Sequence, residues 1–412
     1  MCAFSGIEMA SDRPKIALIM PWYGLDTAGG AEVHGRRLAE SLRAAGVEIE
    51  VWTSCGKDFF SPHLPRYYPE GPGQVNGVPV LRFPVRQEPA ISFFRAHPEV
   101  LAEGEPPALT PDHPAGELIV ADALFEHIVA HRQEYFFVFM PYVWGTAVWG
   151  ARLCPERTFL IPCLHDEPWA YAPVYKPTFT RVRGLLFNSE PEAELARRLY
   201  GIDVRRAAVI GEGIDMHWQG DARRFRHKYG LYDPFILFVG RRDQGKRALT
   251  LISYFCEYKS RHPNRLKLAL AGKNPIDIPS AFAADIIDLG FLEEQDKHDA
   301  YAAATIFCQP SAVESFSIVL MEAWLQGTPA LVNAECAVTV DHCRKSGGGL
   351  YFADYFEFEA CIEYLLARPA LRRRMGQLGA EYVRRNYRWE DVAQRLIQRV
   401  YGPAGPMVAE KA

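Results

Sequence analysis

Short apolar runs alternate with longer amphipathic stretches from residue 15 onwards. Residues 15–20, KIALIM, have the composition of a buried strand. In the stretch that follows, Leu38, Leu42 and Ala45 share one helical face, and Gly46 then ends the pattern. Further strands are expected at 47–54, 135–142, 158–165 and 184–188, a hairpin at the Asn-Gly pair within 74–85, and helices at 116–133 and 190–201. Strands that recur between helices predict a mainly parallel sheet with helices on both faces.

A second series of the same kind begins near residue 234. Its expected strands are 234–240, 266–272, 286–290, 305–310 and 328–333, and its expected helices are 248–263, 293–304 and 317–326. The charged stretch 213–233 has little apolar pattern, and we expect an inter-domain linker there. The predicted fold class is therefore α/β, with two doubly wound domains whose strand ends face a common cleft.

Chain length supports two domains, because a single core usually stops growing at about 250–300 residues and this chain has 412. The expected parts are a loose leader at 1–13, an amino-terminal domain at 14–213, a carboxyl-terminal domain at 214–385 and a final helix and tail at 386–412. Residues 86–115 contain six prolines and are too long for an ordinary connection, so we expect a loop insertion there.

Composition excludes several classes of protein. There are 46 Lys and Arg against 50 Asp and Glu, a formal charge of −4, so no global basic field predicts a nucleic-acid partner. The nine cysteines include no C-x-x-C pair, which argues against a disulfide framework or a zinc ribbon and favours reduced thiols in a cytoplasm. The first residues lack a secretory signal pattern, and no apolar run reaches the 18–20 residues of a spanning helix.

Two acids, Glu314 and Glu322, lie eight positions apart in PSAVESFSIVLMEAWLQGTP, residues 310–329. We expect a helix to begin at Ser315 to Ser317, where a serine hydroxyl can cap the first free N–H groups. Those N–H groups and the helix dipole favour a phosphate. One acid could then accept hydrogen bonds from sugar hydroxyls and the other from a ribose, as in a sugar joined through a diphosphate to a nucleoside. The alternative is a helix-start acid and a solvated helix residue.

Two cationic residues follow the first strand of the second series. Arg241 and Lys246 flank the turn in RRDQGKR, where they could neutralise a departing diphosphate. A solvated charge run is the alternative interpretation. Their position in the same domain as the paired acids favours the diphosphate.

The amino-terminal half offers weaker candidates. Gly29 and Gly30 stand between the first strand and its helix, where the backbone could approach a ligand closely or simply make a tight turn. His165 ends an expected strand and is followed by two acids, but no second nearby His or Cys completes a set of metal ligands. A contact with substrate or a charge-stabilising role is the preferred interpretation, and a structural histidine is the alternative. His127 and His131 are four apart, but a surface pair is the better explanation.

The sequence contains no D-x-D triplet of the kind that holds a divalent ion on nucleotide sugars, and no H-E-x-x-H or G-x-S-x-G motif. We therefore expect chemistry without a metal or another cofactor. Cationic side chains and the helix end would then stabilise the leaving diphosphate.

The chain resembles the retaining glycosyltransferases of family GT4, which have the two-domain GT-B fold. The family's E-x7-E motif is similar to Glu314…Glu322 in ESFSIVLMEAWLQGTPAL. The resemblance extends over GGAEVHGRRLAESLRAAGVEIEVWT, FNSE, FVGRRDQGK, GFLEEQDKHDAYAAATIFCQPS and YRWEDVAQRLIQRVYG, and so over nearly the whole chain outside the leader and 86–115. The chain differs from the common pattern at Ser315 and Ser317, where glycines are usual; the serines narrow the pocket or add hydroxyl donors.

The resemblance implies roles for individual residues. It implies that Arg241 and Lys246 contact the donor diphosphate, that Glu314 contacts the sugar and that Glu322 contacts the ribose. It also implies that the backbone N–H groups of residues 316–318 bind phosphate. The full set of implied site residues is Gly29, Gly30, His165, Arg241, Lys246, Glu314, Phe316, Ser317, Ile318 and Glu322, with His165 near the reacting centre and the final helix, from about Trp389, returning to the first domain.

The resulting hypothesis is a metal-independent retaining glycosyltransferase that uses a nucleotide diphosphate sugar and acts on a saccharide or a lipid-linked saccharide in polysaccharide or glycoconjugate assembly. The alternatives are a sugar-nucleotide epimerase or glycan phosphorylase of the same fold, and a non-catalytic nucleotide-sugar-binding subunit. We expect a cytoplasmic protein. The aromatic residues within 91–97 suggest either peripheral contact with the inner face of a membrane or an insertion packed on its own domain.

Overall fold

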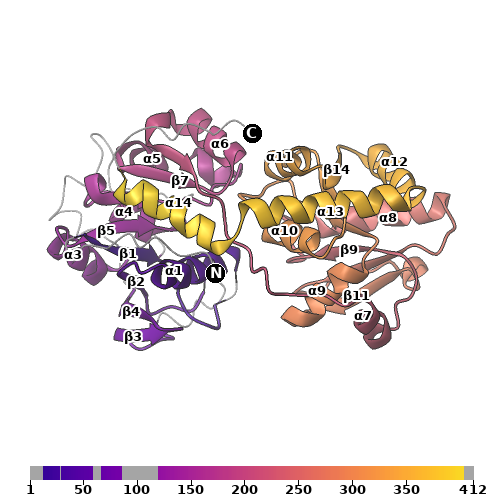
Figure 1. Cartoon of the computed structure of the whole chain (residues 1–412), viewed down its shortest axis with the longest axis horizontal. Helices are drawn as coiled ribbons and strands as arrows, with labels where there is room; N and C mark the ends of the chain where they lie inside the picture. The colour runs from indigo at the N-terminus through magenta and orange to yellow at the C-terminus, as the bar shows by residue number, and fades with distance from the viewer. Residues whose placement is uncertain (1–12, 28, 59–65, 86–118, 403–412) are drawn as a thin grey trace, which may run out of the picture. The chain divides into compact units, whose positions relative to one another are not determined.

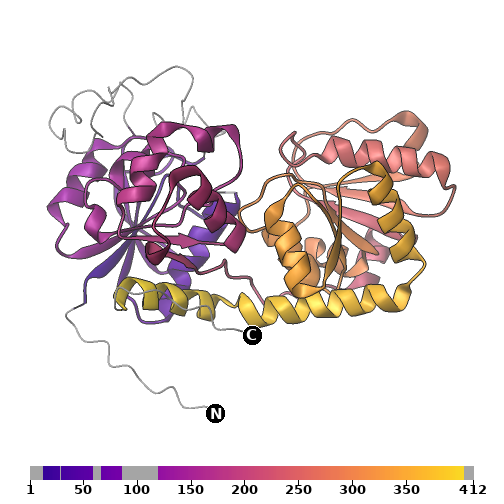
Figure 2. The same cartoon turned by 90° about the horizontal axis from the view of Figure 1, so that it is seen from above.

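The computed structural model describes residues 13–27, 29–58, 66–85 and 119–402. The expected leader, apart from Arg13, the insertion at 86–115 and the end of the tail lie outside the described residues. The chain forms two compact units, one of Met1–Gly213 with Trp389–Ala412 and the other of Ile214–Arg388. Each unit contains a sheet with helices on both faces (Figures 1 and 2), which confirms the predicted α/β class.

The sheet of the first unit has eight strands, all parallel to their neighbours except β3, which pairs antiparallel with β4. In spatial order the strands are β3 (Gly71–Val75), β4 (Val78–Phe83), β2 (Ile49–Ser54), β1 (Lys15–Met20), β5 (Tyr135–Phe139), β6 (Thr158–Leu160), β7 (Gly184–Phe187) and β8 (Ala207–Val209). Asn76 and Gly77 join β3 to β4 with φ values of 47° and 82°. Positive φ at both central residues is what a type I′ hairpin needs, so the predicted hairpin is confirmed.

Helices cover both faces of this sheet. They are α1 (Gly30–Ala44), α3 (Asp122–Ala130), α4 (Gly145–Gly150), α5 (Lys176–Arg181), α6 (Glu190–Tyr200) and α14 (Trp389–Tyr401), with short 3₁₀ turns at Pro155–Arg157, Pro168–Tyr171, Pro173–Tyr175 and Val204–Arg206. On one face, Leu38 and Leu42 of α1 share a buried cluster with Val392 and Leu396 of α14. The last helix of the chain therefore completes the core of the first unit.

The sheet of the second unit has six strands, all parallel. In spatial order they are β11 (Ile286–Gly290), β10 (Lys267–Ala271), β9 (Phe235–Val239), β12 (Ile306–Gln309), β13 (Ala330–Asn333) and β14 (Gly349–Phe352). Its helices are α7 (Ala222–Tyr229), α8 (Ala248–Arg261), α9 (Glu294–Ala303), α10 (Ile318–Leu325), α11 (Ala337–Ser346), α12 (Tyr355–Leu366) and α13 (Pro369–Asn386), with a 3₁₀ turn at Ser280–Phe282. Strand order reverses between β9 and β12, and ligands of doubly wound sheets bind at the carboxyl ends of the strands beside such a point.

The prediction of an inter-domain linker at 213–233 is wrong for most of that stretch, because Ile214 onwards belongs to the second unit and helix α7 lies within it. Asp221 caps helix α7 by accepting from the N–H groups of Arg223 and Arg224, and α7 packs against α9. Only Phe225 of this helix is buried, because the helix is short and otherwise charged. Its apolar pattern is too sparse to be recognised in the sequence.

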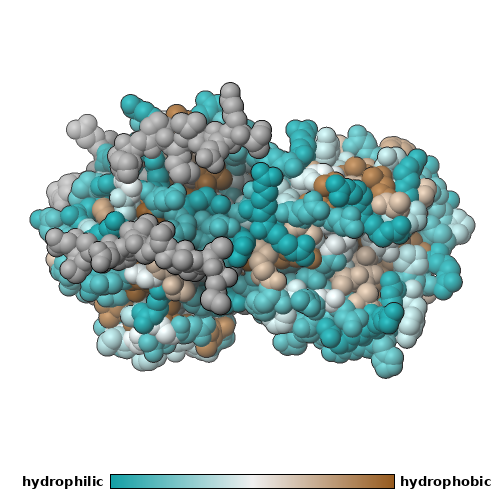
Figure 3. Space-filling model, viewed as in Figure 1, coloured by the Kyte–Doolittle hydropathy of each residue, from teal (hydrophilic) through white to brown (hydrophobic). Residues whose placement is uncertain are grey.

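Most of the surface visible in Figure 3 is hydrophilic, with small hydrophobic patches between the charged side chains. Scattered apolar residues of this kind are normal for a folded protein. Among the described residues, no helix has both the length and the apolar character needed to cross a membrane.

Candidate functional site

The turn between β12 and α10 contains the first candidates. Helix α10 begins at Ile318, and Ser317 precedes it with φ 81° and ψ 77°, in the left-handed region. The expected helix start is therefore confirmed. The expected serine cap is wrong for Ser317, because its hydroxyl makes no cap bond and donates instead to Oε1 of Gln309 at 2.7 Å.

Phe316 anchors this turn through its buried side chain. Its ring is almost fully buried and packs edge-on against His342 and Tyr387, with ring centroids 5.3 Å and 4.8 Å away. Because the side chain is fixed, the backbone of 316–318 is held at the amino end of α10. The structure thus places these three residues where helix N–H groups can meet an anion.

Glu314 and Lys246 meet although they are 68 positions apart in the sequence. Lys246 Nζ is 2.6 Å from Glu314 Oε1, and the same oxygen accepts from Gln309 Nε2 at 2.8 Å. Lys246 belongs to the turn after β9, where its backbone N–H donates to Asp243. Strands β9 and β12 are neighbours at the point of strand reversal, which explains why their following turns come together.

Arg241 is arranged differently from Lys246. Its side chain is 57% exposed, and Nε is 3.0 Å from Asp243 Oδ2. The neighbouring Arg242 is instead buried and bonded to Asp288 and to the carbonyl of Leu270. Of the two predicted cations, the structure brings Lys246 to Glu314 and leaves Arg241 in an exposed ion pair in the same turn.

Glu322 is buried in the second turn of α10, so its interpretation as a solvated helix residue is wrong. Its carboxylate accepts from Lys297 Nζ and from the hydroxyl of Tyr301, each at 3.0 Å and both from α9. Burial raises the pKa of Glu322, while the charge and the hydrogen bond of Lys297 oppose that rise. Lys297 was not among the predicted site residues; its spacing of four from Tyr301 puts both on one face of α9, but the sequence does not show that this face is directed toward Glu322.

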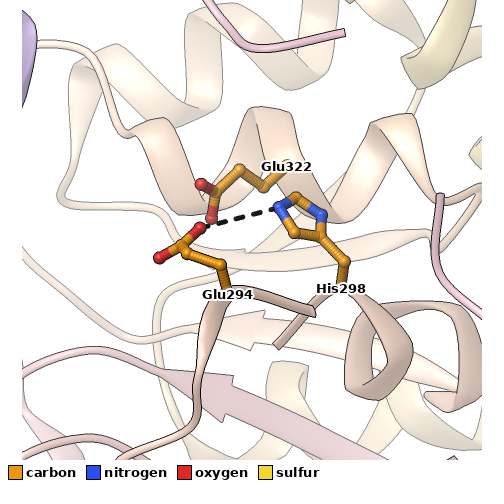
Figure 4. Close-up of side chains that lie close together, drawn as sticks. All are labelled: Glu294, His298 and Glu322. Atoms are coloured by element: carbon orange, nitrogen blue, oxygen red, sulfur yellow. Dashed lines mark ion pairs between the residues drawn. The ribbon is translucent and has the colours of Figure 1, made fainter. Parts of the chain in front are cut away.

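Glu294, His298 and Glu322 lie close enough for one ligand atom of each to approach a common point, and the dashed line in Figure 4 joins Glu294 to His298, whose atoms are 3.9 Å apart. Lys297 Nζ is 3.0 Å from a carboxylate oxygen of Glu294 and 3.0 Å from one of Glu322. An ammonium group therefore already supplies the positive charge between these two acids.

The tautomer of His298 also disfavours a metal at this group. Gln326 Oε1 accepts from the backbone N–H of Gly220, so its amide nitrogen faces His298 Nδ1, 3.2 Å away. Nδ1 must accept that bond, which leaves the proton of the neutral ring on Nε2. Nε2 is the nitrogen that points toward Glu294, and a protonated nitrogen is not a metal ligand.

Gly29 and Gly30 lie in the first unit, where Gly29 precedes α1 and Gly30 is its first residue. The backbone of Gly29 is extended, with φ −176°, which any residue can adopt, and its carbonyl accepts the first hydrogen bond of α1. A Cβ at Gly29 would lie 2.0 Å from a carboxylate oxygen of Glu32, so a side chain here would displace Glu32. Because the end of a flexible side chain can move away, neither space nor backbone conformation requires a glycine at position 29.

His165 follows β6 in the first unit and is partly exposed. Its Nδ1 is 3.9 Å from Glu167 Oε1, and burial raises the pKa of Glu167. The sequence analysis missed Glu192, whose buried carboxylate accepts from the N–H groups of Leu164 and Asn188, each at 2.6 Å. Glu192 thereby holds the residue next to His165.

A sequence signal for Glu192 was available. Ser189 and Glu192 have the S-x-x-E spacing of a capping box at the start of α6, and the N–H of Glu192 donates to the hydroxyl of Ser189 at 3.3 Å. Burial raises the pKa of Glu192 to about 8, against the hydrogen bonds it receives from the backbone. Glu192, which the sequence places in the first turn of a helix, is therefore a buried residue that binds two backbone N–H groups outside that helix.

Two family descriptions match consecutive parts of the chain. Residues 29–213 match the Glycosyl transferase 4-like domain, and residues 221–382 match Glycosyl transferases group 1. The chain belongs to the GT4-type glycosyltransferases. This confirms the resemblance drawn from the sequence and the expectation of an enzyme, whereas the roles of individual site residues stay predictions.

Curated relatives are similar in sequence to nearly the whole chain. D-inositol 3-phosphate glycosyltransferase of Kribbella flavida is 28% identical, with 97% of this chain and 99% of the relative covered. Phosphatidyl-myo-inositol mannosyltransferase of Mycobacterium leprae is 23% identical, with 94% and 96% covered.

Solved structures show the same fold. Sucrose-phosphate synthase of Thermosynechococcus elongatus matches with a TM-score of 0.69 at 19% identity, covering 94% of this glycosyltransferase and 98% of the synthase. HepE of Anabaena, in complex with UDP and glucose, matches with a TM-score of 0.67 at 14% identity, covering 93% and 98%. Both likenesses support the GT-B fold.

Proposed function

We propose that this glycosyltransferase moves a sugar from a nucleotide diphosphate sugar to an acceptor hydroxyl, with retention of anomeric configuration and without a metal ion. The acceptor is a saccharide or a lipid-linked saccharide, and the setting is polysaccharide or glycoconjugate assembly in the cytoplasm or at the inner face of a membrane. The names of the relatives, which include glycosyl and mannosyl transferases, support the reaction class.

One observation carries the proposal. Two carboxylates whose side chains are only 9% and 12% exposed, Glu314 and Glu322, stand before and within the first turns of α10, and each is paired with a lysine from a different element, Lys246 or Lys297. The free N–H groups at the amino end of α10 lie between the two acids along the chain. A nucleotide diphosphate sugar has its groups in the same order, with the hydroxyls of the sugar at one end, the anionic diphosphate in the middle and the hydroxyls of the ribose at the other end.

The reaction is then divided among few residues. Lys246, Arg241 and the N–H groups of residues 316–318 hold the diphosphate and stabilise its growing charge as it leaves. Glu314 accepts hydrogen bonds from the sugar, and Glu322 accepts them from the ribose hydroxyls. The bond from the anomeric carbon to the phosphate oxygen breaks, a bond to the acceptor oxygen forms on the same face, and the leaving phosphate oxygen takes the acceptor proton. His165, Gly29 and Gly30 belong to the first unit, and their roles rest on the family resemblance.

A donor panel tests the reaction class. Purified protein is incubated with UDP-, GDP- and ADP-sugars, with and without exhaustive chelation, and release of nucleoside diphosphate is measured together with the anomeric configuration of the product. We expect release from one donor type, full activity after chelation and a retained configuration. A phosphorylase would instead require inorganic phosphate, an epimerase would change the sugar without releasing nucleoside diphosphate, and strict dependence on a divalent ion would contradict the metal-free mechanism.

Two variants test the residues. We expect Lys246→Ala and Glu322→Ala each to lower turnover at least ~100-fold, as removal of a charge-stabilising or positioning group commonly does. Lys345→Ala is the matched control, because Lys345 forms a surface pair with Asp341 one turn away on α11 and should leave turnover unchanged. Near-normal rates in both site variants would refute the assignment.

A further inference from the structure

Ser317 occupies a backbone position that favours glycine. Its φ of 81° lies in the left-handed region, which residues with a Cβ rarely adopt, and its side chain is buried. Glycine would fit here without strain. A serine in this place therefore calls for a use of its hydroxyl group.

The hydroxyl has a definite partner. Ser317 Oγ donates to Oε1 of Gln309, the last residue of β12, over 2.7 Å, and both side chains are buried. With its oxygen committed to Ser317, Gln309 can present only its NH₂ group on the other side. That group is 2.8 Å from Glu314 Oε1. The reversed amide would set an oxygen against a carboxylate, so the charge of Glu314 decides the orientation of the Gln309 amide, and the hydroxyl of Ser317 then donates to the amide oxygen.

The second hydrogen-bond donor to Glu314 is Lys246, which is more exposed than Gln309. Lys246 reaches the same oxygen at 2.6 Å with a long side chain that keeps 27% of its surface exposed. A lysine ammonium can turn between several acceptors, and a diphosphate would compete with Glu314 for it. Gln309 is buried at the end of a central strand and has no such freedom. It keeps its hydrogen bond to Glu314 whichever acceptor Lys246 selects.

We propose that Gln309 and Ser317 are a positioning pair that fixes the carboxylate of Glu314 toward the sugar of the donor. The hydrogen bond from Ser317 restrains the amide of Gln309, and the amide of Gln309 in turn restrains the carboxylate of Glu314. This inference rests on the proposed function, because the benefit of the pair is a correctly placed sugar contact. It also explains why the serine at 317 is compatible with the fold: its hydroxyl is directed into the protein and away from the expected phosphate.

Steady-state kinetics of a double-mutant cycle test the pair. The variants are Ser317→Ala, Gln309→Leu and both together, studied with the donor that the wild type uses. We expect each single variant to lower kcat about 10-fold while inhibition by the free nucleoside diphosphate changes less than twofold, since the sugar contact alone is disturbed. Because Ser317 acts through Gln309, we expect the double variant to match Gln309→Leu.

A further variant separates positioning from stability. Ser317→Gly removes the hydroxyl and also the left-handed strain, so its midpoint of thermal unfolding should equal or exceed that of Ser317→Ala while kcat stays about 10-fold low. Ser311→Ala is the matched control, because Ser311 is a buried serine near the same strand whose hydroxyl has no hydrogen-bond partner in the described part of the chain. Its kcat should be that of the wild type.

Three results would overturn the inference. Wild-type kcat in Ser317→Gly would show that the hydroxyl has no role, additive losses in the double variant would indicate that Ser317 contacts the donor directly, and equal losses of kcat and of nucleoside diphosphate affinity would indicate a general distortion of the turn. Absence of turnover by the wild type with every donor is a different result. It would refute the proposed function itself, and the positioning role with it.

Discussion

Lys297 shows how one cationic residue changes the ionisation of a neighbouring buried acid, Glu322. A carboxylate as buried as that of Glu322 is costly to ionise without a partner, and burial accordingly raises its pKa. The ammonium of Lys297 lies between Glu322 and Glu294, and their negative charges raise the pKa of Lys297 against the effect of its own burial. Each charge thus favours the ionised form of the other, and an ionised Glu322 is the better acceptor of hydrogen bonds from hydroxyls.

We expect Lys297→Met to shift the pH dependence of donor binding. Glu294, Lys297, His298 and Tyr301 face Glu322, and loss of the lysine removes the cation that opposes the raised pKa of Glu322. The carboxyl group then takes up its proton at a higher pH, so the KM for the donor should begin to rise at a higher pH as the solution is acidified. The KM for the donor, measured between about pH 5 and 8, checks this.

The controls separate charge from packing. Lys297→Arg keeps the cation and should keep the wild-type profile. Lys228→Met removes an exposed lysine that pairs with Asp296 on the same helix α9, and it should leave the profile unchanged. An unshifted profile in Lys297→Met would mean that Glu322 does not need this partner.

At the scale of elements, one buried acid makes several of the hydrogen bonds that join helix α7 to helix α9. Asp299 of α9 accepts from the backbone N–H of Asp221, from Gln295 and from the guanidinium of Arg224. Burial alone would raise the pKa of Asp299, but the hydrogen bonds from these donors more than compensate and lower it. Asp299 therefore ties the start of a short, poorly buried helix to a longer one.

We expect Asp299→Asn to lower the free energy of unfolding of the second unit by about 2 kcal/mol near neutral pH, because hydrogen bonds to a charged group are weakened and one acceptor is lost. A depressed pKa contributes stability that is present above the unfolded value near 4 and is lost as the pH falls through the lower folded value. The difference between wild type and variant should therefore shrink below about pH 4. Urea unfolding at several pH values measures it.

Asp296→Asn provides the comparison for this experiment. Asp296 lies on the same helix and pairs with the exposed Lys228, and solvent screens such pairs so that they usually contribute little to stability. A loss in Asp296→Asn as large as that in Asp299→Asn would assign the effect to helix α9 in general. A constant difference down to about pH 2 would contradict the role of ionised Asp299.

The sequence predicted elements best where the apolar pattern is dense. Strands β1, β9, β10 and β12 were anticipated because each is mainly an apolar run in the middle of a parallel sheet, and β2 was anticipated because its apolar and polar residues alternate. Helix α7 was taken for a linker because only Phe225 marks its buried face. Its position is decided by contacts with α9, which no local pattern reveals.

In the candidate site, too, some residues were predicted from the sequence and others became evident only in the structure. The E-x7-E spacing pointed to Glu314 and Glu322, and the turn after β9 pointed to Lys246. The partners that hold these residues, Gln309 and Lys297, could not be chosen from the sequence, because a glutamine at a strand end and a lysine in a charged helix are usually exposed. Only the fold shows that both are directed inward.

At the scale of the whole molecule, the chain passes from one unit to the other and back. The first unit ends at Gly213, the second occupies Ile214–Arg388, and α14 belongs again to the first unit. On α14, Val392, Leu396 and Val400 are fully buried in the same cluster as β1 and α1. The first unit therefore lacks part of its core until the last helix is in place, and its stability should depend on residues that come after the whole second unit in the sequence.

We expect Leu396→Ala in the full chain to destabilise the first unit selectively. Truncating a fully buried leucine costs about 2–5 kcal/mol through lost burial and the cavity left behind. Amide hydrogen exchange should become faster in the slowly exchanging strands β1 and β5, while protection in β9 and β12 stays unchanged, because no residue of the second unit belongs to this cluster. Ile362→Ala on α12, a fully buried residue of the second unit, should give the reverse pattern. If either substitution lowered protection in both sheets equally, the two units would unfold as one, and the return of α14 would stabilise the molecule as a whole instead of completing a single core.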